Sequence, residues 1–218
     1  MNVSTVTLFQ FYRKHKIRYI TTNYIYQQGF RVELKNIHSF TIKLAALIKS
    51  GAPVIYFDEA AFNVWMRNRR TWTSRERPVK MVINERRLPG ITVFGAINSA
   101  LSKPVFMIGK STNKEEVLSF FRLIRQTLWF TKETKLYIVL DNARAHIGTI
   151  VKTYCEEHNI ELLFMPGYSP EFNTIEALWS VIKRRVKSKL AQRKFVNLVE
   201  EDFKNLVLDV LDNVTPEE

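Results

Sequence analysis

Residues 136–146 read LYIVLDNARAH, a short apolar run that ends in Asp141. Its length and its β-branched and large apolar residues are typical of a buried strand. Residues 53–57 (PVIYF) repeat the arrangement and directly precede Asp58. Open α/β sheets gather their ligand sites where strands end. The two segments therefore predict neighbouring strands whose carboxylates, Asp58 and Asp141, meet at one edge of a sheet.

The segments around these two strands predict the rest of an α/β layer. Residues 91–97 (ITVFGAI) and 104–108 (PVFMI) indicate an antiparallel hairpin, with a turn near Asn98. Residues 114–130 and 147–157 have helical patterns, and residues 160–165 (IELLFM) predict another strand. This order favours a mixed central β-sheet flanked by α-helices.

A long last helix is predicted from Ile175 onward. Its apolar residues recur every three or four positions, which gives one buried face. They are Ile175, Leu178, Ile182, Val186 and Leu190. Glu176 lies in the first turn of this helix and is the third acid that could reach the same edge of the sheet.

The composition indicates a basic globular protein. Its 218 residues include 33 Lys and Arg against 21 Asp and Glu, for a formal charge of +12, so nucleic acid is the first partner to test. Cys155 is the only cysteine, which excludes an intramolecular disulfide and a zinc ribbon and favours an intracellular location. No apolar run is long enough to predict a membrane span.

Three carboxylates brought together repel one another, and divalent cations are a usual remedy. Ligation by oxygen alone favours Mg²⁺ or Mn²⁺. When a phosphodiester bond is cut, two such ions could activate the attacking oxygen and stabilise the leaving oxygen. No small-molecule cofactor is expected. Each residue also has a structural alternative. Asp58 and Asp141 could be turn residues, Glu176 could belong to a cap with Asn173, and His146 could be a structural hydrogen-bonding group.

Three segments resemble the signature blocks of mariner-superfamily transposases and related bacterial insertion-sequence transposases. They are YFDEAAF (residues 56–62), LYIVLDNARAH (136–146) and MPGYSPEFNTIEALWSVIKRRVK (165–187). Residues 142–175, which are 34 in number, separate Asp141 from Glu176, a spacing characteristic of one branch of that superfamily. Thr174 departs from the usual proline, and Glu76 stands where a glycine often follows the Trp72 segment. In the third block the matching residues are Tyr168, Ser169, Pro170, Asn173, Ile175 and Trp179.

The resemblance implies an RNase H-like fold and an enzyme that cleaves DNA at transposon ends and transfers strands into a target duplex. It makes Asp58, Asp141 and Glu176 the catalytic, metal-binding acids, and it places Asn142 and His146 beside the metals. It also implies a homo-oligomer when active, working in the nucleus of a eukaryote or the cytoplasm of a bacterium. The expected organisation is an N-terminal helix and linker, a remnant of a DNA-binding region (1–50), a catalytic domain (51–194), and a C-terminal helix that packs on the core or at a dimer contact (195–218).

Two basic regions are candidate DNA contacts. On the last helix, Lys183 and Lys187 share a face with Glu176, and Arg184 flanks them. The alternative is a solvated basic face. A second basic stretch, interleaved with Trp65 and Trp72, predicts a strand or hairpin that follows DNA; its candidate contacts are Arg67, Arg69, Arg70, Arg75 and Arg77.

Two other functions are compatible with the same residues. An RNase H-like nuclease could cut DNA without strand transfer. A decayed or host-adopted transposase could keep only the fold and bind DNA, although the intact acids disfavour this reading.

Overall fold

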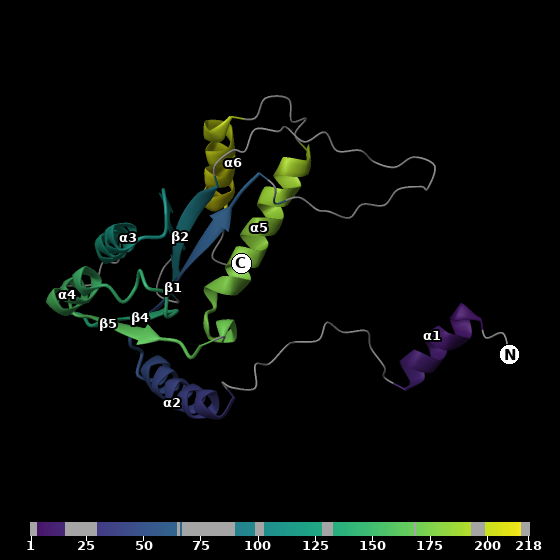
Figure 1. Cartoon of the computed structure of the whole chain (residues 1–218), viewed down its shortest axis with the longest axis horizontal. Helices are drawn as coiled ribbons and strands as arrows, with labels where there is room; N and C mark the ends of the chain where they lie inside the picture. The colour runs from purple at the N-terminus through teal and green to yellow at the C-terminus, as the bar shows by residue number, and fades with distance from the viewer. Residues whose placement is uncertain are drawn as a thin grey trace. The chain divides into compact units, whose positions relative to one another are not determined.

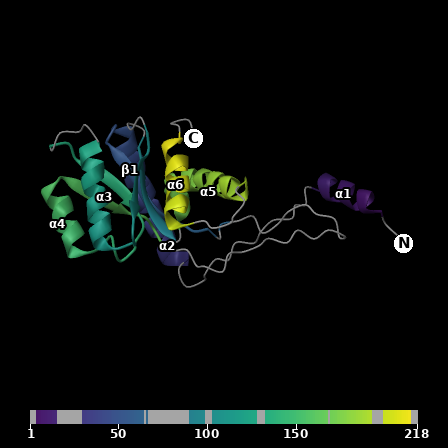
Figure 2. The same ribbon diagram turned by 90° about the horizontal axis from the view of Figure 1, so that it is seen from above.

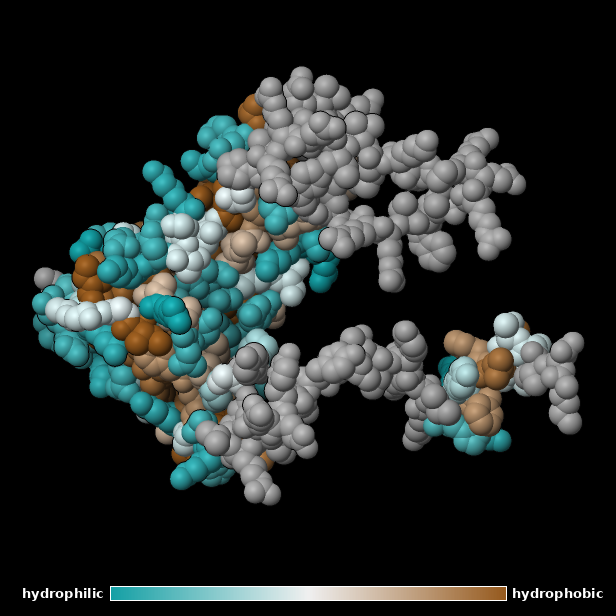
Figure 3. All heavy atoms as spheres, in the orientation of Figure 1, coloured by the Kyte–Doolittle hydropathy of each residue, from teal (hydrophilic) through white to brown (hydrophobic). Residues whose placement is uncertain are grey.

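The computed structural model describes residues 4–15, 30–64, 66, 90–98, 103–127, 133–167, 169–192 and 199–214. The chain divides into two compact units, residues 1–35 and 36–218. The first contains helix α1 (Thr5–Lys14), which buries none of its residues and leaves apolar side chains such as Phe9 exposed. Figure 3 shows apolar surface on this helix. Among the described helices, none is both long and apolar enough to cross a membrane.

The second unit is built on a mixed sheet, shown in Figure 1, whose described strands lie in the order β3-β2-β1-β4-β5. The pairs β1–β2 and β2–β3 are antiparallel, and the pairs β1–β4 and β4–β5 are parallel. This arrangement confirms the predicted hairpin and the predicted mixed α/β layer. The strands are β1 (Val54–Phe62), β2 (Ile91–Ile97), β3 (Val105–Gly109), β4 (Leu136–Leu140) and β5 (Ile160–Phe164).

Alternation along β1 separates the two faces of the sheet. Ile55 and Phe57 pack with helices α3 (Lys114–Thr127) and α4 (Thr149–Glu157). Ala60 and Phe62 pack on the other face, with α5 (Ile175–Gln192) and α6 (Glu200–Asp212). Figures 1 and 2 show these two pairs of helices on opposite sides of the strands. Even-numbered and odd-numbered residues of β1 therefore point into different environments.

Helix α2 (Phe30–Lys49) packs against strands β1, β4 and β5. Its Leu44 is buried with Val54 of β1, Val139 of β4 and Leu163 of β5. Lys43 on the same helix pairs with Glu161 of β5 at 2.7 Å. Residues 36–49 of α2 thus belong to the compact second unit.

Helix α5 begins at Ile175 and buries the whole predicted apolar stripe, from Ile175 to Leu190, which confirms that prediction. Its close approach to the sheet depends on Gly95 of β2. A Cβ atom at this position would lie 2.6 Å from the ring of Trp179 and 3.0 Å from Ile175. Only glycine leaves room for α5 at this distance from the sheet.

The prediction that Asp58 follows the end of its strand is wrong. β1 continues to Phe62, because its antiparallel pairing with β2 runs from Tyr56↔Ile97 to Phe62↔Ile91. Only the parallel pairing with β4 stops earlier, at Tyr56↔Val139. Asp58 therefore lies inside β1, just beyond the point at which the parallel ladder ends.

Candidate active site

The strand register places Asp58 next to Asp141. Tyr56 pairs with Val139 in the parallel ladder, so two further residues along each strand reach Asp58 and Asp141. Asp141 directly follows β4, as predicted. The central position of β1, next to β4, thus brings together two acids that are far apart in the sequence.

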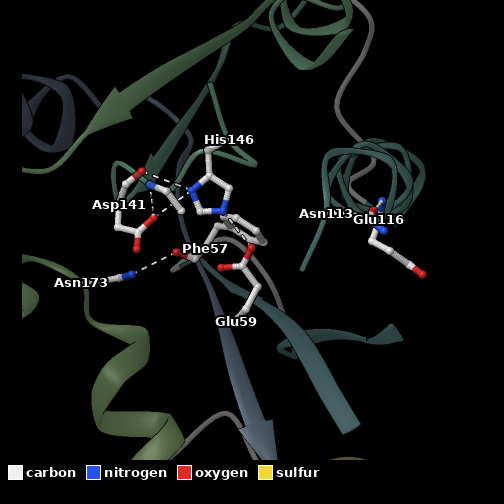
Figure 4. Close-up of polar contacts among 8 residues, drawn as sticks. Phe57, Glu59, Asn113, Glu116, Asp141, His146 and Asn173 are labelled. Atoms are coloured by element: carbon white, nitrogen blue, oxygen red, sulfur yellow. Dashed lines mark hydrogen bonds and ion pairs between the residues drawn. The ribbon is translucent and has the colours of Figure 1, made fainter. Parts of the chain in front are cut away.

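Asn173 ties the start of α5 to the strand that carries Asp58. Its buried side-chain Nδ2 donates to the carbonyl oxygen of Phe57 at 2.9 Å (Figure 4). The backbone N–H of Glu176 donates to the carbonyl of Asn173 at 3.1 Å. The described side-chain bond of Asn173 therefore reaches the sheet instead of the helix start that the cap alternative required. It fixes the helix turn that carries Glu176 against β1.

Asp58 experiences both its own burial and the charges of the other two acids. Burial raises the pKa of Asp58 to about 7; a hydrogen bond from the backbone of Glu59 opposes this shift, and the charges of Glu176, Glu59 and Asp141 add to it. Asp58 is half-buried, whereas Asp141 and Glu176 are exposed. Within the described residues, no three His, Cys, Asp or Glu side chains lie close enough together to form a metal-binding group. The site thus concentrates negative charge at an open edge of the sheet.

His146 forms a buried bridge between Asp141 and Glu59. Its Nδ1 lies 2.8 Å from Oδ1 of Asp141, and its Nε2 lies 2.8 Å from Oε1 of Glu59. Figure 4 shows the imidazole between these two carboxylates, with Phe57 beside it. Burial would lower the pKa of His146, but the hydrogen bonds with Asp141 and Glu59 raise it to about 10. A protonated ring can donate from both nitrogens.

The same bridge holds Asp141 in its ionised form. The hydrogen bond from His146 lowers the pKa of Asp141 below its usual value, against the opposing effect of burial, and the N–H of Ala143 also donates to Oδ1, at 2.9 Å. His146, predicted to lie beside the metals, contacts Asp141 directly. Sequence reasoning missed Glu59. The available signal was its position directly after Asp58, which directs it to the opposite face of the sheet.

Asn142 anchors the loop that follows β4. Its Nδ2 donates to the carbonyl of Met165 at 2.7 Å, just after β5. The backbone N–H of Met165 in turn donates to the carbonyl of Leu140. Asn142 therefore links the ends of β4 and β5 and supports the loop that carries Asp141.

The basic residues of α5 fall into two groups. Arg185 donates to the carbonyl of Asn213, and Lys189 pairs with Asp209, so both connect α5 to α6. Lys183, Arg184 and Lys187 lie on parts of the helix that remain partly or fully exposed. The predicted DNA contacts Arg67, Arg69, Arg70, Arg75 and Arg77 lie outside the described residues, as do Trp65 and Trp72.

Solved structures of Mos1 mariner transposase have a similar fold. The catalytic domain of Mos1 mariner transposase has a TM-score of 0.58 with 13% identity, covering 89% of this chain and 86% of that one. The Mos1 mariner paired-end complex with Mn has a TM-score of 0.69 with 14% identity, covering 99% and 65%. At this identity the likeness shows the fold, which is RNase H-like, as predicted.

Sequence comparison gives the family. The Tc1 transposase of Caenorhabditis elegans is 24% identical over 168 residues, covering 72% of this chain, and the Tc3 transposase of the same organism is 26% identical over 137 residues, covering 61%. The chain spans 61% and 42% of the lengths of these relatives. The family described as DDE superfamily endonuclease matches residues 53–200, a range that contains all three acids and most of the chain. The chain therefore belongs to the DDE superfamily of endonucleases.

Proposed function

We propose that this chain is the catalytic core of a DNA transposase, which cuts phosphodiester bonds at transposon ends and joins them to target DNA. The observation that supports the proposal is the placement of three acids on neighbouring elements. The strand register puts Asp58 and Asp141 on adjacent strands, and the Asn173–Phe57 hydrogen bond ties the start of α5, which carries Glu176, to β1. Family membership and the Tc1 and Tc3 relatives support the same reaction.

The donor set of this site fits divalent cations. Three carboxylates supply hard oxygen ligands of the kind that Mg²⁺ and Mn²⁺ prefer. The pKa of Asp58 is raised chiefly by burial and further by the charges of Glu176, Glu59 and Asp141, and a nearby dication would offset both effects. Mos1 structures containing Mn or Mg support this assignment. We propose two ions, which when bound would lower the pKa of the attacking oxygen and stabilise the leaving one.

The protein's own residues would position the DNA and the acids. Asp141 and Glu176 are exposed, so a phosphodiester can approach them from solvent. Lys183 and Lys187 lie about two and three helical turns beyond Glu176, on the same face of α5 as Glu176 and Ser180, where they can contact flanking phosphates. Arg184, and Arg67, Arg69, Arg70, Arg75 and Arg77, are proposed to extend this basic surface. The positive charges of these lysines and arginines would hold the phosphate backbone of the DNA while the acids act on one phosphate.

Transposition brings two transposon ends together, so the active form is proposed to be a homo-oligomer. We propose that it works in the nucleus of a eukaryotic host or in the cytoplasm of a bacterial host. The Mos1 paired-end and strand transfer complexes support a homo-oligomer by analogy. The Mos1 strand transfer complex also supports the proposal that this chain transfers strands in addition to cleaving them. An assay that supplies pre-cut 3′-hydroxyl ends separates this activity from simple nuclease action.

The test of the acid site is a cleavage assay on a labelled duplex with Mg²⁺ or Mn²⁺. Asp141→Asn should reduce nicking on the order of 1000-fold, because metal ions contribute several kcal/mol to such reactions and each 1.36 kcal/mol is tenfold in rate. Asp212→Asn, which changes an exposed acid on α6, is the control and should cut like the wild type. Equal nicking by Asp141→Asn and the wild type would count decisively against the proposal.

A further inference from the structure

Glu59 has a nearly buried carboxylate beside the acid site, with a side chain that is only 10% exposed. It follows Asp58 directly on β1, so the two side chains point to opposite faces of the sheet. Even-numbered neighbours of Asp58, such as Ala60, pack with α5, whereas Phe57 packs with α3 and α4. Glu59 therefore lies on the α3 side and Asp58 on the side of Glu176. This placement separates Glu59 from the proposed metal ligands.

The partner of Glu59 is His146, whose side chain is 1% exposed. Nε2 of His146 is held by Glu59 at 2.8 Å, and Nδ1 contacts both Oδ1 and the backbone carbonyl of Asp141, at 2.8 and 3.2 Å. The ring also packs edge-on against Phe57, with centroids 5.3 Å apart. With both nitrogens engaged and one edge packed, the imidazole has a single orientation.

Asp141 needs such support because its side chain is 55% exposed and lies in the loop after β4. Left free, an exposed carboxylate samples several rotamers, and ordering it on metal binding costs free energy. His146 and the N–H of Ala143 both donate to Oδ1. That arrangement leaves Oδ2 as the oxygen available to a cation.

We propose that Glu59 is a positioning residue that acts through His146 to fix the carboxylate of Asp141 for metal binding. This inference rests on the proposed function. Glu59 contacts neither the reacting atoms nor the metal in this scheme. Glu59 orients the imidazole of His146, and His146 in turn orients the carboxylate of Asp141. In other metal sites, outer carboxylates orient histidines in the same way.

Two substitutions separate the reach of Glu59 from its charge. Glu59→Gln keeps the length and an acceptor oxygen for Nε2 but removes the charge, whereas Glu59→Asp keeps the charge but is one methylene too short. Glu59→Ala removes both. The matched control is Glu161→Gln, which alters a strand glutamate paired with Lys43 and Lys135 at the far edge of the sheet.

The measurement is Mn²⁺ affinity of the full chain by titration calorimetry, with thermal unfolding recorded for each variant and the Mn²⁺ dependence of cleavage in parallel. Loss of an outer partner typically weakens metal affinity by about 10–100-fold. Glu59→Ala and Glu59→Asp should show that loss, and Glu59→Gln should stay within a few-fold of the wild type. Glu161→Gln should bind Mn²⁺ like the wild type.

A double-mutant cycle tests whether Glu59 acts through His146. If it does, Glu59→Ala combined with His146→Ala should bind Mn²⁺ no more weakly than His146→Ala alone. Additive losses would overturn the relay, as would unchanged Mn²⁺ affinity in both Glu59→Ala and Glu59→Asp. If Glu59→Ala does not fold, the contrast between Glu59→Gln and Glu59→Asp decides. A wild-type chain that binds no Mn²⁺ and cuts no DNA would instead refute the proposed function, and this inference with it.

Discussion

Asp58 is the acid of the site whose ionised form is most disfavoured in the folded chain. Its pKa rises from 3.8 to about 7, chiefly through burial, with the charges of Glu176, Glu59 and Asp141 adding to the effect. Between these two pH values the native chain therefore binds more protons than the unfolded chain. Stability from this group falls as pH rises through that range, and the loss is complete above about pH 7. An acid site without its cation is thus a destabilising element at neutral pH.

We expect Asp58→Asn to unfold at a higher temperature than the wild type in metal-free buffer at about pH 8, because it removes this repulsion and the cost of burying a charge. Each kcal/mol gained corresponds to about 2–4 °C in a chain of this size. The difference should shrink as pH is lowered toward about 4, where the wild-type acid is protonated in the native state. Circular dichroism melts with a chelator measure it, and Asp212→Asn on α6 is the control. A gain that does not depend on pH would contradict this cause.

Asn173 should be important for both stability and activity. Asn173→Ala leaves the carbonyl of Phe57 without its buried donor, which costs about 1–3 kcal/mol. The start of α5 would also lose its tie to β1, so cleavage should fall further than stability alone explains. Denaturant unfolding and the nicking assay check the two effects. Asn213→Ala, which removes an exposed donor to the carbonyl of Asp209, should be much milder in both.

At the scale of single residues, the sequence predicts the three acids and His146 but not what holds them. Two acids after apolar runs and one at a helix start are visible in the chain itself. The bonds Asn173–Phe57 and Glu59–His146 join residues that only the folded sheet brings together. A hydrogen-bonded partner far away in the sequence leaves no local pattern, so these contacts could not be predicted.

Among the elements, α5 matters most because it carries Glu176 to the sheet. Its stripe was predictable because helical periodicity is a local signal. The extent of β1 was not. Asp58 and Glu59 have polar side chains that suggest the end of a strand, yet pairing with β2 continues through them to Phe62. Tertiary pairing overrides the local preference here.

Gly95 provides the test of how closely α5 must pack. A methyl group at this position would lie 2.6 Å from Trp179, so Gly95→Ala should destabilise the fold by about 1–3 kcal/mol through overpacking. It should also reduce cleavage, because displacement of α5 moves Glu176 away from Asp58. Gly167→Ala is the matched control, since nothing lies within 4 Å of its added methyl group. Equal unfolding free energies for the two variants would show that α5 tolerates the displacement.

Over the whole molecule, a formal charge of +12 predicts that the proposed DNA binding depends strongly on salt. If Lys183 and Lys187 each contact a phosphate, replacing either with alanine should reduce the slope of log affinity against log salt by about 1. Fluorescence anisotropy with a labelled duplex at several salt concentrations measures the slope. Lys189→Ala should leave it unchanged, because that lysine pairs with Asp209. A slope that neither Lys183→Ala nor Lys187→Ala reduces would place the DNA elsewhere.

The sheet order also has a consequence for biosynthesis. β1 leaves the ribosome early, but the strand that pairs with it in parallel, β4, and the helix that carries Glu176 follow much later in the chain. Pairing between such distant segments is slow compared with local helix formation. A nascent polypeptide therefore carries its acids on separate, unjoined pieces until translation has passed α5. Any reaction that requires the three acids together therefore has to wait until α5 has been synthesised.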